Sequence, residues 1–424
     1  MHQLTQEENS TTLLSRCFVI AFLGLLVFMP LLEAPKNIFA FSLLIMGIIA
    51  LVTHRRPLQP IQKIYLLWLA VAGIVTVHTV VSYGYSGEGF RDIFRSLSLG
   101  LIITLFYFIR LNEMQLLMAI LLGASASLAW GIYDLYINAV PVVEMHSLGH
   151  PNHSAIYLQL CICIGLPYLF FARSTIWSKL VIAALLGFMA LGILMMQSRA
   201  VIAAMVIIIC LAFVAAVLAR RWIVITALIG MILVSLVSLG SVYSKIVEKH
   251  HFWFNHYVLN EQGHLTPRGQ INTMSDYVFE QFPLLGIGYE NYSDFTANKL
   301  RPMLEERGEI LPNVVEDWLL GFHPHNTFYD QLTASGIVGF LVFLVFFAYT
   351  FRFIWYHRPC KGTDKQAWQI EWWWLSVLFI VFSILAIGLF NSSLRHENAV
   401  LTFTMLSYFL THYDVARNLK SETG

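Results

Sequence analysis

Three residues of this 424-residue chain combine the chemistry of proton transfer with that of anion binding: His325, Arg199 and Arg268. The imidazole of His325, with an ordinary pKa near ~6.5, is suited to remove a proton from a hydroxyl at neutral pH. Arg268 is expected in the first turn of a helix, where unpaired N–H groups and the helix dipole already favour an anion. Arg199 stands in a polar break between two apolar runs, where an arginine usually faces a cavity or a partner. The three residue types predict a base beside an anion site.

Each of these residues also has a structural interpretation. Arg199 could extend to the membrane interface, Arg268 could be an ordinary surface arginine, and His325 could cap a helix. Their expected position on one face of the membrane favours the chemical interpretation. Carboxylates that could orient the second nitrogen of His325 are Asp330, Glu316 and Asp317.

No metal or other cofactor is predicted. Six histidines lie in or beside one large loop, at 250, 251, 256, 264, 323 and 325, but their spacing fits no zinc motif. The five cysteines lie in or beside apolar segments and imply no disulfide framework. Gly-rich phosphate loops and nucleophile-elbow motifs are also absent from the sequence.

The elements that must position these residues are membrane helices. Apolar residues make up 58% of the chain and charged residues 12%, which is far from a soluble domain. We expect an all-α polytopic protein with about 12 spans and one large helical loop, without a removable signal peptide. The expected spans are 17–35, 38–53, 64–83, 93–110, 114–138, 154–172, 178–197, 200–219, 222–242, 327–353, 371–390 and 397–413; the second is short, so the count could be one lower.

Basic residues of short loops predict the orientation, because they are retained on the cytoplasmic side. Most fall on the side of both termini. The opposite short loops carry few: Lys36, Arg91, Arg95, Arg199 and Arg395. We therefore expect both termini in the cytoplasm and the large loop outside, which in a bacterium is the periplasm. The expected division is 1–242 (nine spans), 243–325 (periplasmic loop) and 326–424 (three spans and the C-terminus).

Within the loop, Thr266-Pro267 predicts a helix start. Ile271, Met274, Val278 and Phe282 then recur at helical spacing until Pro283. Gly286-Ile287-Gly288 is expected to end this element, and residues 293–312 are expected to be a charged, solvated stretch. In the span after His325, Gly336 and Gly339 are expected to permit close packing against a neighbouring helix.

These segments resemble the bacterial O-antigen ligases. The resemblance is carried by Gln197-Ser198-Arg199-Ala200, Arg268 before a helix, Gly286-Ile287-Gly288-Tyr289, and His325-Asn326 followed by Gly336 and Gly339. It implies transfer of a glycan from undecaprenyl pyrophosphate to a sugar hydroxyl of the lipid A core, at the periplasmic face of the inner membrane and without a metal. Arg199 and Arg268 would hold the pyrophosphate, and His325 would activate the acceptor. A single displacement would invert the anomeric carbon.

Other residues are candidates for lining the substrate path. Gly149-His150-Pro151-Asn152 is similar to a segment common in this superfamily and could equally be a turn; it supplies Asn152. The other candidates are His323, Asn326, Arg91 and Arg95.

Two related activities and one unrelated class stay open. An O-antigen polymerase or a protein O-oligosaccharyltransferase would use the same donor. A transporter would also have many spans, but the sequence shows no repeats and its polar candidates gather at one membrane surface. The net charge of +1 argues against nucleic acid as a partner. The expected partners are the lipid-linked donor, the lipid A-core acceptor and membrane lipids; the oligomeric state stays open.

Overall fold

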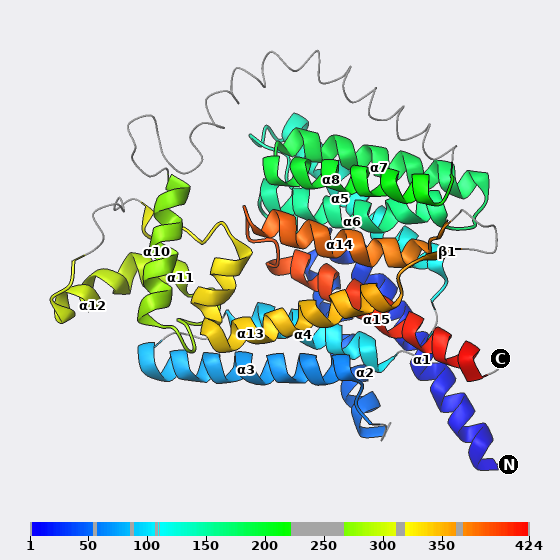
Figure 1. The fold of residues 1–424 in the computed structure, drawn as a ribbon, viewed down its shortest axis with the longest axis horizontal. Coiled ribbons are helices and arrows are strands. Elements are labelled where there is room, and N and C mark those ends of the chain that lie inside the picture. Colours follow the sequence, from blue (N-terminus) through cyan, green and yellow to red (C-terminus); the bar gives the residue numbers. More distant parts are fainter. Residues whose placement is uncertain are drawn as a thin grey trace.

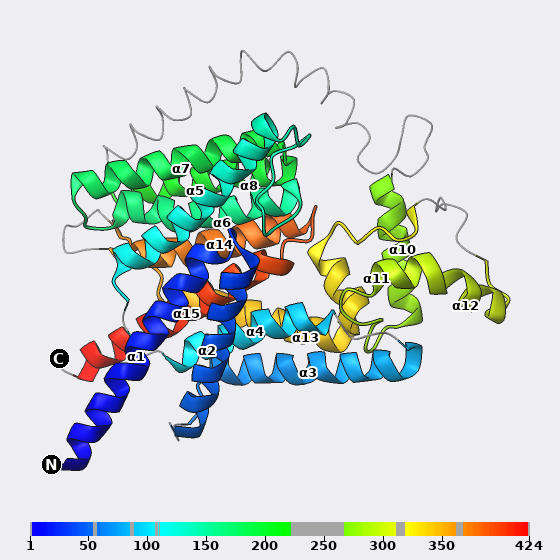
Figure 2. The same ribbon diagram turned by 180° about the vertical axis from the view of Figure 1, so that it is seen from behind.

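The computed structural model describes residues 2–53, 57–84, 89–106, 109, 111–221, 267–310, 319–361 and 368–422. Long helices lie roughly side by side in a bundle, and a group of shorter helices covers one end of it (Figures 1 and 2). Both termini lie at the other end. We call the covered end the capped end.

The all-α polytopic architecture predicted above is confirmed. Seven of the described helices are long and apolar enough to cross a membrane. Each expected span corresponds to a helix except 222–242, which lies outside the described residues. These helices are α1 (His2–Phe28), α2 (Glu33–Thr53), α3 (Pro60–Tyr83), α4 (Phe90–Leu105), α5 (Glu113–Ile137), α6 (Pro151–Phe171), α7 (Ile176–Met196), α8 (Arg199–Leu218), α13 (Thr327–Tyr356), α14 (Trp372–Gly388) and α15 (His396–Glu422). Two short strands, β1 (Cys360–Lys361) and β2 (Trp368–Gln369), pair between α13 and α14.

Helix α6 lies at the centre of one group of helices in the bundle (Figure 1). It packs against α5, α7, α14 and α15, and 94% of its most apolar stretch is buried. Its start is defined by His150, whose ring nitrogen accepts from the backbone N–H of Asn152, and by Pro151 at the first helical position.

An aromatic cluster holds α13 against α3 and α15. The rings of Trp68, Phe343 and Phe403 approach edge to face, with centroids 5.4 to 6.0 Å from Trp68. The Tyr65 hydroxyl lies 2.7 Å from that of Ser407. Such pairs add stabilisation beyond the area they bury, so α13 is fixed along its membrane segment.

The capped end is built from α10 (Pro267–Gln281), α11 (Tyr292–Asp294), the π-helix η1 (Phe295–Lys299) and α12 (Leu300–Arg307). The predicted amphipathic helix is confirmed as α10, with Ile271, Met274 and Val278 buried. Its proposed cap, Thr266, lies outside the described residues. The expectation of a solvated stretch after residue 293 is wrong in part, because Phe295 and Leu300 are buried in a small core with α10.

A break in α13 receives the turn that follows α10. Gly336 has φ 59° and ψ −167°, a backbone conformation that is nearly exclusive to glycine. The carbonyls of Thr333 and Ala334 therefore accept from the amides of Ile287 and Gly288, both at 2.9 Å. The partner that approaches Gly336 closely is this turn rather than the neighbouring helix we expected, and it joins two glycine segments far apart in sequence.

Candidate active site

His325 lies immediately before the cap of α13. The Asn326 side chain accepts from the backbone N–H groups of Phe328 and Tyr329, at 2.8 and 3.3 Å. The helix itself begins at Thr327. The imidazole is thus presented from the start of a rigid helix at the capped end of the bundle.

The surroundings of His325 favour the neutral form of its imidazole. Burial lowers its pKa, and the positive charges of Arg268 and Arg395 lower it further, with a smaller contribution from His150. The Asn391 side chain opposes this by hydrogen bonding. A neutral imidazole at neutral pH is the form that can accept a proton.

Arg268 is the second residue of α10, as the sequence predicted. It is exposed, and its guanidinium donates to the carbonyl of Phe390 at 3.3 Å. Phe390 lies next to Asn391, so Arg268 and His325 are brought to the same short segment between α14 and α15. The structure therefore brings together two of the three predicted residues.

Arg199 begins α8 and is exposed. Helix α8 packs on α14, the helix that leads to Phe390. The role of Arg199 in the site stays a prediction.

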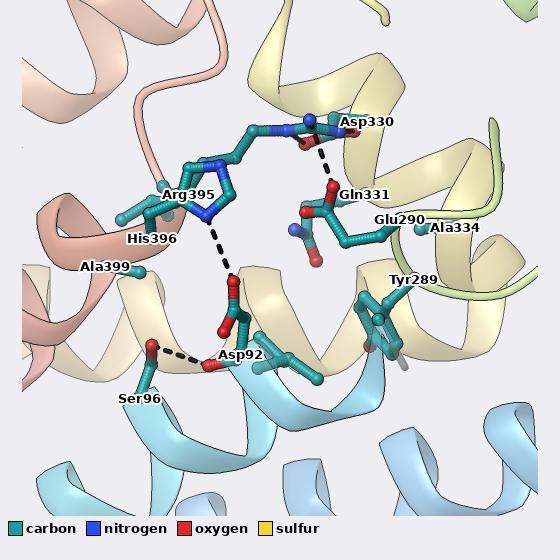
Figure 3. A pocket seen from close by; sticks show the side chains of 13 residues that line it. Asp92, Ser96, Tyr289, Glu290, Asp330, Gln331, Ala334, Arg395, His396 and Ala399 are labelled. Carbon is teal, nitrogen blue, oxygen red and sulfur yellow. Dashed lines mark hydrogen bonds and ion pairs between the residues drawn. The ribbon is translucent and has the colours of Figure 1, made fainter. Parts of the chain in front are cut away.

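A buried ion cluster that we did not predict lies beside the site. Arg395 is 7% exposed and donates to both carboxylate oxygens of Asp330, from Nε at 3.0 Å and Nη2 at 2.7 Å. Its Nη1 is 3.3 Å from Glu290 (Figure 3). Burial raises the pKa of Glu290 although Arg395 opposes this. We call Arg395, Asp330 and Glu290 the Arg395 cluster.

The cluster changes the expected role of Asp330, which binds Arg395 through both carboxylate oxygens. The other carboxylates considered for His325, Glu316 and Asp317, lie outside the described residues. The sequence offered one signal for Arg395, a basic residue in a short loop opposite the positively charged side.

A cavity of about 30 Å³, lined by both polar and apolar residues, opens among Asp92, Glu290, Gln331, Arg395 and His396, as Figure 3 shows. That volume suits about two water molecules. It is too small for a sugar.

The remaining candidate residues lie around this end of the bundle. Ring nitrogens of His323 lie 2.9 and 3.0 Å from the Ser293 hydroxyl, and burial, followed by the charge of Arg395, lowers the pKa of His323 to about 4. Arg95 is 3.4 Å from Glu397 and 3.6 Å from Asp92.

Arg91 and Asn152 lie at helix starts. Arg91, near the start of α4, is highly exposed and 4.0 Å from Asp92. Asn152 lies in the first turn of α6 and is half-buried. Arg91 is thus more accessible to a lipid phosphate than Arg95.

Possible metal ligands are not clustered in the described part of the chain. Among the described residues, no group of three His, Cys, Asp or Glu side chains is arranged to hold a metal ion. Four of the histidines considered above, at 250, 251, 256 and 264, lie outside them.

Residues 182–344 match the family model described as O-antigen ligase. The predicted resemblance to the O-antigen ligases is confirmed. The match covers less than half of the chain, yet it contains Arg199, Arg268 and His325 and ends within α13. No curated protein matches the chain. The O-antigen ligase match supports glycosyl transfer of the ligase or polymerase type in a membrane, with lipid-linked substrates.

Proposed function

We propose that the chain is an O-antigen ligase that transfers a glycan from undecaprenyl pyrophosphate to a sugar hydroxyl of lipid A-core. The observation that carries this proposal is the placement of His325 at the start of α13 and of the exposed Arg268 on Phe390, at the same end of the bundle and within a segment that matches the O-antigen ligase family.

In the proposed reaction, the acceptor hydroxyl loses its proton to His325 while its oxygen attacks the anomeric carbon of the donor glycan. The bond from that carbon to the phosphate oxygen breaks, and undecaprenyl pyrophosphate leaves with the bonding electrons. Arg268 and Arg199 stabilise the charge of the leaving diphosphate. Attack from the opposite face inverts the configuration, and no step requires a metal.

The proposed setting is the inner membrane of a bacterium, with both termini in the cytoplasm and the capped end in the periplasm. The placement of the termini opposite α10 to α12 supports this arrangement (Figure 1). Because the periplasm lacks nucleotide donors, the pyrophosphate linkage supplies the free energy of transfer.

Reconstitution into liposomes with a polyprenyl-pyrophosphate glycan, rough lipopolysaccharide and EDTA tests the proposal. We expect glycan on the lipopolysaccharide, with an inverted linkage by NMR. Growth of the polyprenyl-linked chain instead would identify a polymerase, and a retained linkage would exclude a single displacement.

The site assignment is tested by His325→Ala, which should reduce transfer by about 10²- to 10⁴-fold. His146→Ala is the matched control, because His146 stacks on Trp130 with ring centroids 5.3 Å apart and has no proposed catalytic part. Undiminished transfer by well-folded His325→Ala protein would refute the assigned base.

A further inference from the structure

The segment between α14 and α15, residues 389–395, grips the chain on both sides of His325. On the N-terminal side, the Ser392 hydroxyl donates to the Pro324 carbonyl at 2.6 Å. On the C-terminal side, the side-chain Nδ2 of Asn326 donates to the carbonyl of Leu389 at 3.1 Å. The backbone that carries the imidazole is therefore fixed by this segment, which we call the 389–395 loop.

Thr327 adds a second attachment at the first residue of α13. Its hydroxyl donates to the carbonyl of Asn391 at 3.1 Å and accepts from the amide of Ser393 at 2.7 Å. Asn391 itself is 7% exposed. The 389–395 loop thus holds residues 324–327 by hydrogen bonds along their whole length.

Arg395 fastens the end of this loop to α13. Its planar guanidinium matches both oxygens of Asp330, a geometry that fixes direction as well as distance. Asp330 lies one helical turn after Asn326, whose carbonyl accepts from the Asp330 amide at 2.9 Å. The remaining guanidinium nitrogen faces Glu290, in the turn that docks on the break in α13. Three segments around His325 therefore meet at one buried side chain.

We propose that Arg395 is a positioning residue for glycosyl transfer: by clamping Asp330 and Glu290, it holds the 389–395 loop against α13 and so aims the His325 imidazole at the acceptor hydroxyl. This inference rests on the function proposed above. Arg395 lies outside the matched family segment, which ends at residue 344. A displacement of about 1 Å at a reacting group can cost about 10²-fold in rate, so a distant clamp can have a large effect.

Arg395 also contributes to the electrostatic field at His325. The charged and titratable groups that lower the proton affinity of the imidazole are Arg268, Arg395 and His150, and His323 interacts with it in turn. Removal of the Arg395 charge would leave the carboxylates of Asp330 and Glu290 without their counter-ion. The pKa of His325 would then rise.

The test compares Arg395→Gln and Arg395→Lys in the full-length protein reconstituted with both substrates. For Arg395→Gln we expect kcat to fall at least about 10-fold, an unchanged KM for the donor, and an acidic limb of the pH profile displaced to higher pH. Arg395→Lys keeps the charge but loses the planar fork. Its acidic limb should stay near the wild-type position while its kcat falls.

Lys36→Gln is the matched control. Lys36 is 3% exposed and lies 2.6 Å from Glu397, so this variant also breaks a buried ion pair at the same end of the bundle. It should lower thermal stability and leave both kcat and the acidic limb unchanged. Equal losses of kcat in Lys36→Gln would reduce Arg395 to a general contributor to stability and overturn the proposal.

Wild-type kcat and pH profile in folded Arg395→Gln would also overturn it. If that variant does not fold, Arg395→Lys decides, since wild-type kcat there contradicts the clamp. Failure of the proposed function is distinguishable, because the wild-type protein itself would then transfer no glycan to rough lipopolysaccharide.

Discussion

Arg395 and Arg268 lie at the same end of the bundle in different surroundings. Arg395 is 7% exposed and holds two carboxylates, whereas Arg268 is exposed and donates to the backbone carbonyl of Phe390. A guanidinium whose planar fork is filled by Asp330 fixes the fold around it. Arg268, which is exposed at the rim of the site, is the guanidinium that we propose binds the leaving diphosphate. The comparison distinguishes an arginine that maintains the structure of the site, Arg395, from one that we propose contacts the substrate, Arg268.

The largest effect that would sharpen this comparison is on stability. Asp330→Asn leaves the Arg395 charge buried with a weaker partner, and breaking a buried pair typically costs about 3–5 kcal/mol. We expect a clear fall in the thermal unfolding temperature of the detergent-solubilised protein. The control is Asp134→Asn, because Asp134 is part of an exposed pair with Asn138 and should change stability by about 0.5 kcal/mol or less. Equal unfolding temperatures for the two variants would contradict the structural role of the Arg395 cluster.

Arg268 should show the opposite behaviour. Arg268→Gln removes a donor proposed to stabilise the leaving diphosphate, which should reduce transfer by about 10²- to 10³-fold. Its unfolding temperature should stay close to that of the wild type, because the side chain is exposed. Arg301→Gln, at another exposed arginine of the capped end, is the control and should retain transfer. Retained transfer by Arg268→Gln would remove the distinction between the two arginines.

A substitution at Gly336 tests the contact between α13 and the turn that leads to Glu290. An alanine there would adopt a backbone conformation that costs about 1–3 kcal/mol, and its Cβ would lie 2.3 Å from the Leu284 backbone. We expect a lower unfolding temperature and weaker transfer, because the turn carrying Glu290 could no longer dock on α13. Gly187→Ala is the control, with no atom within 4 Å of the added Cβ. A neutral Gly336→Ala would show that the break in α13 is dispensable.

Much of the fold could be predicted from the sequence because long apolar runs in lipid have few alternatives to helix. Local patterns predicted, in the same way, the start of α13 after His325-Asn326 and the apolar face of α10. Local patterns also predicted that Arg268 lies in the first turn of α10.

The rest of the site depends on contacts across the chain. Arg395 and Asp330 are 65 residues apart, and no periodicity links them. The position of Asp330 on the helical turn after His325 suggested it as a partner for the imidazole, whereas in the fold that carboxylate binds Arg395. Likewise Gly336 correctly predicted a close approach, but the expected partner, a neighbouring helix, was wrong. The turn before Gly286 approaches it instead, because a glycine shows that a side chain is absent and not what fills the space.

Asn326 provides the smallest and most selective test. The sequence made it a candidate for lining the substrate path, whereas its side chain caps α13 and donates to Leu389, which places it with the holding residues. Asn326→Ala should cost about 1 kcal/mol through loss of the cap, and Asn326→Asp should cost less, because a carboxylate still accepts from Phe328 and Tyr329. Unfolding temperatures in the order wild type, Asp, Ala would support the cap. A raised KM for the acceptor with an unchanged unfolding temperature would instead move Asn326 to the residues that the substrate contacts.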